Sequence, residues 1–251
     1  MTVLPADLVA ALPRLAARRP LLIACDYDGV LARLRDDPSA AVPEPGVAEV
    51  LARLATRDGV TVALVSGRGV DDLRRTSGLT GPYRWVGSHG AEFDGPIGPE
   101  AARRRDALAA RLAPLVDGTP AARLEVKPAS VAVHVRQVTD RTAAAALLAR
   151  AREQADPELT LKPGKDVLEL AVTDADKGSA LCRLRDDLGA ACVLYLGDDL
   201  TDEDAFAVLR PHDLGVKVGP GDTRATARVA DPTAAISLLV ALDEALTSTR
   251  G

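Results

Sequence analysis

Apolar and polar positions divide the chain into two kinds of segment. Three short apolar runs, at 21–25, 60–65 and 191–196, lack polar alternation and end in small or polar residues. Such runs are typical of strands that are buried on both faces. Two further strands are expected at 84–86 and 214–218, and amphipathic spacing predicts helices at 45–55, 70–75, 178–188 and 202–209. This alternation predicts an α/β domain with a parallel sheet and helices on both faces.

The middle of the chain has a different pattern. It predicts a helix at 99–115, a hairpin, a helix at 141–154 and a second hairpin. The hairpins, LEVKPASVAVHV from Leu124 and LTLKPGKDVLEL from Leu159, are both expected to turn at Lys-Pro, either as a repeat or as two unrelated hairpins. We therefore expect a small antiparallel α+β unit at 98–172, inserted into a larger domain at 1–97 and 173–251.

Composition and charge limit the classes of function. The chain is 47% hydrophobic and 27% charged, which is typical of a globular protein. A net charge of −5 and only one Trp, three Tyr and two Phe disfavour a nucleic-acid partner. No apolar run reaches the roughly 18 residues of a membrane span. Three cysteines without paired spacing favour a reducing compartment, so we expect a cytoplasmic protein.

Acidic side chains follow two of the predicted central strands. Ligands of open parallel sheets bind beyond the carboxyl ends of the strands, where Asp26, Asp28, Ser66 and Asp198 are expected. Asp26 and Asp28 are two residues apart and could approach a common point, and Gly29 permits a turn. Because clustered carboxylates repel one another, we expect a Mg²⁺ ion among them. A solvated Asp-Tyr-Asp-Gly turn is the alternative.

A serine and a lysine near predicted helix starts indicate a phosphate site. The Ser66 hydroxyl and its loop amides could hold a phosphate oxygen, or Ser66 could only cap the next helix. Lys177 follows Asp174 and Asp176, which are expected to cap a helix that begins near this lysine. A cation there opposes the helix dipole unless a phosphate is bound; a surface lysine is the alternative.

The segment GDDLTDEDAF at 197–206 is strongly acidic. Thr201 and Asp204 have the spacing of a capping box, which accounts for the acids at 202–204. It does not account for Asp198 and Asp199 at the strand end, and these we assign to the metal.

Asp-x-Asp-Gly, Ser, Lys and Gly-Asp-Asp, in this order, resemble the four motifs of haloacid-dehalogenase-like (HAD) phosphohydrolases. The resemblance implies a Rossmann-like core with an inserted αββαββ cap. It implies that Asp26 is the nucleophile, that Asp28 is the general acid and base, and that Ser66 and Lys177 hold the phosphoryl group. Mg²⁺ would be bound by Asp26, the Asp28 carbonyl and Asp198, supported by Asp199 or Asp202. Val30 stands where the family more often has threonine.

The insert is expected to determine the substrate. Polar residues alternate with Val131, Val133 and Val135, so one face of this strand is polar, although a solvated face is the alternative. DYDGVL, VSGR, GSHGAE, EVKPASVAVHVR, PGKDVLEL, DKG and GDDLTDEDAF resemble the trehalose-phosphatase family. The resemblance implies disaccharide-binding residues in the insert and others that line the cleft. The first set is Glu125, Lys127, Arg136, Lys165 and Glu169, and the second is Arg68, His89, Glu92 and His134.

We therefore expect a Mg²⁺-dependent phosphatase that converts trehalose 6-phosphate to trehalose through an aspartyl-phosphate, the last step of trehalose biosynthesis. One alternative is a capped phosphatase for another sugar phosphate, such as sucrose phosphate or mannosyl-phosphoglycerate. The other is a non-catalytic phosphosugar-binding module, which would not need Asp26, Asp28 and Lys177. We expect a monomer with no membrane partner, and functional pairing with a trehalose-phosphate synthase.

Overall fold

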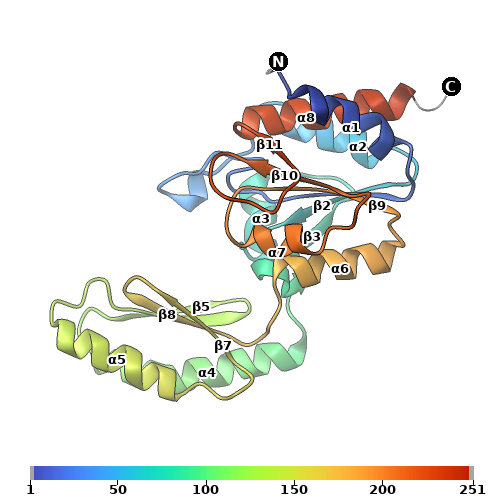
Figure 1. Ribbon diagram of the computed structural model, residues 1–251. Helices are drawn as coiled ribbons and strands as arrows, with labels where there is room; N and C mark the ends of the chain where they lie inside the picture. The colour runs from blue at the N-terminus through green and yellow to red at the C-terminus, as the bar shows by residue number, and fades with distance from the viewer. Residues whose placement is uncertain (1–2, 249–251) are drawn as a thin grey trace. The chain divides into compact units, whose positions relative to one another are not determined.

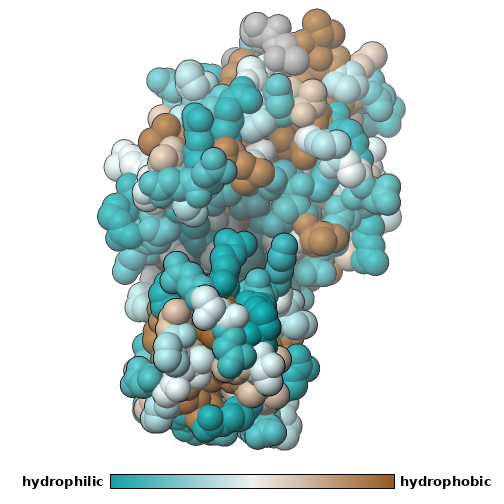
Figure 2. Space-filling view, turned by 90° about the vertical axis from the view of Figure 1, so that its left-hand side faces the viewer, coloured by the Kyte–Doolittle hydropathy of each residue, from teal (hydrophilic) through white to brown (hydrophobic). Residues whose placement is uncertain are grey.

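The computed structural model describes residues 3–248, which fold into two compact units. One unit comprises the described residues of Met1–Gly95 and Asp176–Gly251, and the other is Pro96–Ala175 (Figure 1). Within 3–248, no helix is both long and apolar enough to cross a membrane. The face in Figure 2 is mostly hydrophilic, as expected of a globular surface.

The larger unit is built on a seven-stranded sheet with the order β11-β10-β9-β1-β2-β3-β4. All neighbouring strands are parallel except β3 and β4. The strands are β1 (Leu21–Cys25), β2 (Val60–Val65), β3 (Arg84–Gly87), β4 (Glu92–Phe93), β9 (Cys192–Gly197), β10 (Leu214–Val218) and β11 (Ala227–Val229). The predicted parallel α/β sheet is thus confirmed, and three of its strands have the expected bounds.

Helices cover both faces of this sheet. They are α1 (Ala6–Ala16), α2 (Val47–Ala55), α3 (Val70–Ser77), α6 (Lys177–Leu188), α7 (Asp202–Ala207) and α8 (Pro232–Ser248), with short 3-10 turns η1 (Pro38–Ala40) and η2 (Ser88–Gly90). On β1, Leu21, Ile23 and Cys25 join one apolar cluster with α1, α2, α3 and α8. Leu22 and Ala24 join the other, with α6 and α7 (Figure 1). Burial on both faces explains why β1 is a continuous apolar run.

The sequence analysis missed two helices of the larger unit. Helix α8 is apolar around most of its circumference and is largely buried between its neighbours, so it shows no amphipathic stripe. Helix α1 contains Pro13, which weakens the helical signal.

The smaller unit has the expected helix–hairpin–helix–hairpin order. Its elements are α4 (Pro99–Asp117), β5 (Arg123–Lys127), β6 (Ser130–His134), α5 (Arg141–Glu153), β7 (Thr160–Gly164) and β8 (Val167–Ala171). The four strands form an antiparallel sheet with the order β5-β6-β8-β7. One face packs against both helices around Val131, Val133, Leu168 and Leu170.

The second hairpin of the smaller unit turns later than predicted. Lys162 and Pro163 lie inside β7, Gly164 pairs with Val167, and the turn is formed by Lys165 and Asp166. Asp166 has a φ of 60°, which a tight hairpin turn needs. Pro163 is tolerated because β7 is an edge strand, where a missing N–H leaves no ladder partner unpaired. The prediction of a turn at Lys-Pro is therefore wrong for this hairpin.

Candidate active site

Three neighbouring strands of the larger unit end beside one another, and each is followed by a polar residue. Asp26 follows β1, Ser66 follows β2 and Asp198 follows β9. Strand β1 pairs with β2 on one side and with β9 on the other, so the order of the strands in the sheet reverses at β1. Ligand sites of open parallel sheets lie at this position, beyond the carboxyl ends of the strands.

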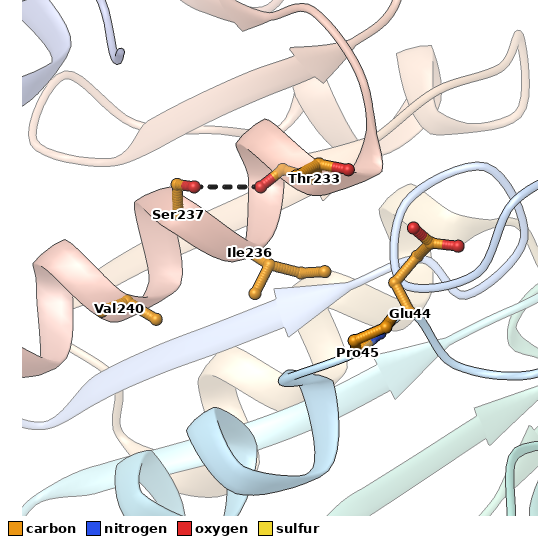
Figure 3. A pocket seen from close by; sticks show the side chains of 6 residues that line it. All are labelled: Glu44, Pro45, Thr233, Ile236, Ser237 and Val240. Atoms are coloured by element: carbon orange, nitrogen blue, oxygen red, sulfur yellow. Dashed lines mark hydrogen bonds between the residues drawn. The ribbon is translucent and has the colours of Figure 1, made fainter. Parts of the chain in front are cut away.

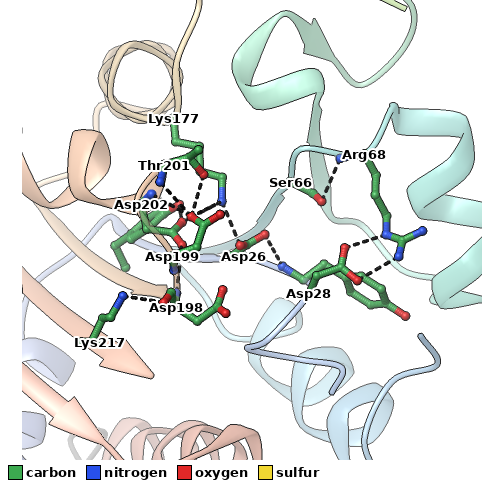
Figure 4. A network of polar contacts seen from close by, with 12 residues as sticks. Asp26, Asp28, Ser66, Arg68, Lys177, Asp198, Asp199, Thr201, Asp202 and Lys217 are labelled. Atoms are coloured by element: carbon green, nitrogen blue, oxygen red, sulfur yellow. Dashed lines mark hydrogen bonds and ion pairs between the residues drawn. The ribbon is translucent and has the colours of Figure 1, made fainter. Parts of the chain in front are cut away.

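Asp26, Lys177 and Asp202 form a buried charged cluster (Figure 4). The Lys177 ammonium donates to Asp26 Oδ2 and to Asp202 Oδ1, both at 2.8 Å. Asp26 Oδ1 accepts from the Tyr27 amide at 2.6 Å. Burial opposes the charge on Lys177, but Asp26 and Asp202 hold its pKa above the usual value. Lys177 is thus a charged ammonium beside Asp26 and not a surface lysine.

The sequence analysis expects Asp174 and Asp176 to cap the helix that carries Lys177, and one of the two is its cap in the structure. Asp176 is the N-cap of α6; its carboxylate accepts from the Ser179 amide at 2.7 Å, and the Ser179 hydroxyl completes the capping box. Asp174 lies two residues earlier and is not this cap. The cap fixes the first turn of α6, and with it the position of Lys177.

Asp202 is fully hydrogen-bonded. Its Oδ1 accepts from Lys177 and, at 2.7 Å, from the Tyr195 hydroxyl. Its Oδ2 accepts from the amides of Asp198 and Asp199, at 2.9 and 3.0 Å. Four donors fill the acceptor sites of a carboxylate, so Asp202 orients its neighbours.

Asp198 and Asp199 lie on the loop that Asp202 holds. Burial, followed by repulsion from Asp202 and Asp199, raises the pKa of Asp198 to about 6. Asp199 Oδ1 accepts from the amide and hydroxyl of Thr201, at 2.9 and 2.7 Å. The predicted capping box of Thr201 and Asp204 is therefore wrong, because the Thr201 hydroxyl bonds Asp199 and makes no cap bond.

The carboxylates fit a hard divalent cation. Asp26, Asp198 and Asp202 each have a carboxylate oxygen within 4.8 Å of the others, and since four donors already fill Asp202, Asp26 and Asp198 are the two that can turn an oxygen to a cation. Burial raises the pKa of Asp26, Lys177 opposes this rise, and Asp202 and Asp198 add to it. Burial and the neighbouring carboxylates thus disfavour the charged form of Asp26, which a bound cation would favour. Carboxylate oxygens are the ligands that Mg²⁺ prefers.

Asp28 is not a member of this cluster. Both of its oxygens accept from Arg68, Oδ2 from Nε at 2.6 Å and Oδ1 from Nη2 at 2.8 Å (Figure 4). Arg68 also donates to the carbonyl of Pro38 and to Asp72, at 2.7 and 3.1 Å. The Asp26 and Asp28 side chains therefore do not meet at a common point, because a cation from the neighbouring loop holds Asp28.

Gly29 is required by close packing at the strand end. Its φ is +79°, and a Cβ there would lie 2.0 Å from Asp198 Oδ2. A side chain at this position would displace the Asp198 carboxylate as well as strain the turn.

Ser66 does not cap the helix that follows it. Helix α3 begins four residues later, with Gly69 as its N-cap. The buried Ser66 hydroxyl accepts from the Arg68 amide at 3.2 Å. Among residues 3–248 the Ser66 hydroxyl has no acceptor, so its proton is available to a ligand.

Polar residues share one face of the sheet in the smaller unit. The Glu169 carboxylate accepts from Lys127 Nζ at 2.7 Å and from the Ser130 hydroxyl at 2.6 Å. Burial works to raise the pKa of Glu169, but these hydrogen bonds lower it overall. His134 Nε2 lies 2.7 Å from Glu125 Oε2. The strand register brings these five residues onto one face.

Two residues that the sequence assigned to the sugar lie off these strands. Arg136 follows β6 and is exposed, and Lys165 is exposed in the β7–β8 turn. Strand β6 ends at His134, so Arg136 lies beyond the residues whose alternation gives the sheet its polar face. Lys162, by contrast, pairs with Glu169 and lies on the polar face.

The sequence analysis did not identify Tyr195 and Lys217 as parts of the site. Tyr195 is buried within β9 and bonds Asp202, and Lys217 Nζ donates to the Asp198 carbonyl. Both lie in strands that the sequence analysis describes only as apolar runs. A Tyr or a Lys inside such a run is the signal that could have identified them.

A pocket elsewhere on the larger unit contains none of the predicted site residues. It is lined by Glu44, Pro45, Thr233, Ile236, Ser237 and Val240 (Figure 3). Its single carboxylate is paired with Arg33, so this pocket does not carry the acidic chemistry.

Comparison with known proteins identifies relatives of this chain. Residues 24–236 match the family model described as trehalose-phosphatase. The trehalose-phosphate phosphatase of Mycobacterium tuberculosis is 38% identical over 232 residues, which cover 85% of this chain and 58% of that protein. That of Mycobacterium avium is 39% identical over 212 residues, covering 78% of this chain and 53% of that protein. The chain thus spans little more than half the length of these curated relatives.

Solved structures share the fold. A trehalose-6-phosphate phosphatase related protein superposes with a TM-score of 0.70 at 25% identity, covering 91% of this chain and 100% of that one. The trehalose-6-phosphate phosphatase of Aspergillus fumigatus gives a TM-score of 0.73 at 24% identity, covering 97% and 99%. The second likeness supports the fold alone.

Proposed function

This chain belongs to the trehalose-phosphatase family, and on that premise we propose that it is a Mg²⁺-dependent phosphatase that hydrolyses trehalose 6-phosphate to trehalose and phosphate. The observation that carries the proposal is the buried Asp26 at the end of the central strand, bonded to the Lys177 ammonium. A carboxylate in this position can act as a nucleophile on a group that the ammonium attracts.

The reaction that the family resemblance implies gives a role to each of Asp26 and Asp28. A carboxylate oxygen of Asp26 attacks phosphorus, the bond from phosphorus to the sugar oxygen breaks, and an aspartyl-phosphate forms. The Asp28 carboxyl gives its proton to the departing sugar oxygen. Asp28 then takes a proton from the water that attacks phosphorus, which releases phosphate and restores the Asp26 carboxylate.

The Arg68–Asp28 pair adds one requirement to this reaction. Both Asp28 oxygens accept from Arg68, so Asp28 must leave at least one of these bonds to reach the sugar oxygen. Arg68 has Asp72 and the Pro38 carbonyl as remaining partners when Asp28 turns away.

Lys177 and Ser66 are proposed to hold the phosphoryl oxygens. The Lys177 ammonium supplies a fixed positive charge, and the Ser66 hydroxyl supplies a donor at the end of the neighbouring strand. Mg²⁺, held by Asp26, Asp198 and the carbonyl of Asp28, would neutralise charge on the transferred group when bound. Asp202 would keep both Lys177 and the 198–199 loop in place, with Asp199 beside them.

We propose that the polar face of the smaller unit binds the sugar hydroxyls. Glu169, Lys127, Glu125 and His134 are paired with one another across this face, and carboxylates and ammonium groups can exchange such pairs for hydroxyls. Arg136 and Lys165 are proposed as further sugar ligands from the exposed segments beside the sheet. A cytoplasmic location, a monomeric state and pairing with a synthase stay predictions.

Phosphate release from a panel of sugar phosphates tests the proposal. We expect turnover of trehalose 6-phosphate well above that of sucrose phosphate and mannosyl-phosphoglycerate, and loss of turnover with excess chelator. Equal turnover of the panel would favour a phosphatase for another sugar phosphate. Binding of sugar phosphate without any phosphate release would favour a phosphosugar-binding module.

A further inference from the structure

Lys217 is a buried lysine in a strand whose other residues are apolar or glycine. It lies near the carboxyl end of β10, where all five residues are buried, and only 4% of its own surface is exposed. Lysines are almost never buried to this extent unless the ammonium is paired. The one hydrogen bond that Lys217 makes to the described chain goes to a backbone oxygen, the carbonyl of Asp198 (Figure 4). The burial of Lys217 is therefore tied to the position of Asp198.

The strand register brings Lys217 to this carbonyl. Lys217 pairs with Gly197, the last residue of β9, and Asp198 is the next residue along the chain. At this point the chain leaves the sheet, so the ladder between β9 and β10 no longer holds it. The Lys217 side chain supplies one more link between the two strands, at the first residue of the loop that carries the acidic cluster.

Two hydrogen bonds hold the Asp198 backbone, one on each side of its Cα. The Asp198 amide donates to Asp202 Oδ2 at 2.9 Å, and the Asp198 carbonyl accepts from Lys217. With both groups bonded, the direction of the Asp198 carboxylate depends on its side-chain rotamer. A Cβ at Gly29 would lie 2.0 Å from Asp198 Oδ2, so the carboxylate fills the space that this glycine leaves open. Three separate segments thus fix one carboxylate.

A carboxylate held in one position discriminates between divalent cations. Mg²⁺ requires a nearly ideal octahedron of oxygens at about 2.0–2.1 Å, whereas Ca²⁺ accepts irregular shells at about 2.3–2.6 Å. Asp26, the other carboxylate proposed to bind the cation, is already held by Lys177 and by the Tyr27 amide. The geometry that the site offers to a cation therefore depends on how firmly Asp198 is held.

We propose that Lys217 is a positioning residue that holds Asp198 for cation binding and thereby makes the site prefer Mg²⁺ to Ca²⁺. The inference rests on the proposed function, which requires a divalent cation held by Asp26 and Asp198. Lys217 acts through the Asp198 backbone and is not itself a ligand, because an ammonium group has no lone pair to give to a cation.

Lys217→Met tests the inference, because methionine fills most of the same space and has no donor. Metal-free protein is titrated with MgCl₂ and, separately, with CaCl₂ at pH 7.5, and each Kd is obtained from the rise in Tm. The Kd for Mg²⁺ should rise about 10–100-fold, the usual effect of losing a group that orients a metal ligand. The Kd for Ca²⁺ should rise by a clearly smaller factor, because Ca²⁺ tolerates a displaced ligand.

Two variants serve as controls. Lys217→Arg keeps a charged donor at this position and should restore most of the preference for Mg²⁺. Arg228→Met removes the same charge from the residue that pairs with Lys217 on the neighbouring strand β11, where the side chain is exposed. It should leave both Kd values unchanged. If Lys217→Met unfolds at too low a temperature for the titration, Lys217→Gln, whose chain is one atom shorter, takes its place with the same expected split.

An unchanged Kd for Mg²⁺ in Lys217→Met would overturn the inference, as would a wild type that binds Ca²⁺ as tightly as Mg²⁺. Equal rises for both cations would overturn it too, because general loosening of the site predicts them. So would lower Kd values for both, which removal of a repelling charge predicts. A wild type whose Tm responds to neither cation contradicts both this inference and the Mg²⁺ of the proposed function. A wild type that binds Mg²⁺ but releases no phosphate from trehalose 6-phosphate contradicts the proposed function alone.

Discussion

The substitution Asp202→Asn tests whether the hydrogen bonds to the buried Asp202 carboxylate stabilise the site. Asp202 is completely buried, and four donors point at its two oxygens. Asparagine has the same shape but only one acceptor oxygen. Whichever way the amide is turned, its NH₂ group faces either the two backbone amides or Lys177 and Tyr195.

The cost follows from the two donors that lose their acceptor. A buried donor left unpaired costs about 1–3 kcal/mol. Two such donors cost about 2–6 kcal/mol, and the lower part applies if the Tyr195 hydroxyl turns to accept from the new NH₂ group. For a chain of this size each kcal/mol lowers Tm by about 2–4 °C, so we expect a decrease of at least about 4 °C. Turnover should fall roughly 10–100-fold, because Lys177 and the 198–199 loop lose their common anchor.

Thermal unfolding with chelator in every sample measures this effect without a contribution from lost metal affinity. Asp222→Asn, at an exposed loop position, is the matched control and should leave Tm unchanged. A Tm for Asp202→Asn within experimental error of both the wild type and the control would refute the argument from hydrogen bonding.

Three further predictions concern the reacting carboxylate, the sugar and the cation. Asp26→Asn should lower turnover more than about 10³-fold with an unchanged circular dichroism spectrum, and residual activity near the wild type would exclude Asp26 as nucleophile. Glu169→Gln should raise KM for trehalose 6-phosphate about tenfold but not for p-nitrophenyl phosphate; equal effects on both esters would argue against sugar binding by this face. The exposed Glu158→Gln is its control. Because the folded protein raises the pKa of Asp198 from 3.8 to about 6, it binds this proton more tightly than the unfolded chain, and metal-free stability should fall as pH rises across that interval. Mg²⁺ requires the ionised carboxylate, so it should raise Tm more at pH 7.5 than at pH 5; equal shifts at both values would count against Asp198 as a ligand.

Much of the site was predictable because strand ends are visible in a sequence. Apolar runs that stop at Asp26, Ser66 and Asp198 place these residues at one edge of a parallel sheet, whatever the details of the loops. Lys177 was predictable for a similar reason, since its position at a helix start conflicts with the helix dipole.

The partners of these residues were not predictable, because they depend on distances between remote segments. The pairing of Asp28 with Arg68 joins positions 40 residues apart. The Thr201 hydroxyl could either donate to Asp199 or accept from the Asp204 amide as a helix cap, and only the conformation of the 198–202 loop selects Asp199. In the second hairpin, Lys-Pro indicates a turn by composition, but the edge position of β7 removes the penalty for proline.

Trapping of the covalent intermediate tests the central claim most directly. The enzyme is mixed with trehalose 6-phosphate and Mg²⁺, quenched in acid during turnover and reduced with borohydride, which converts an aspartyl-phosphate to homoserine. The account predicts homoserine at position 26 alone, and none when substrate is omitted. Homoserine at another aspartate, or complete turnover without any modified residue, would contradict it.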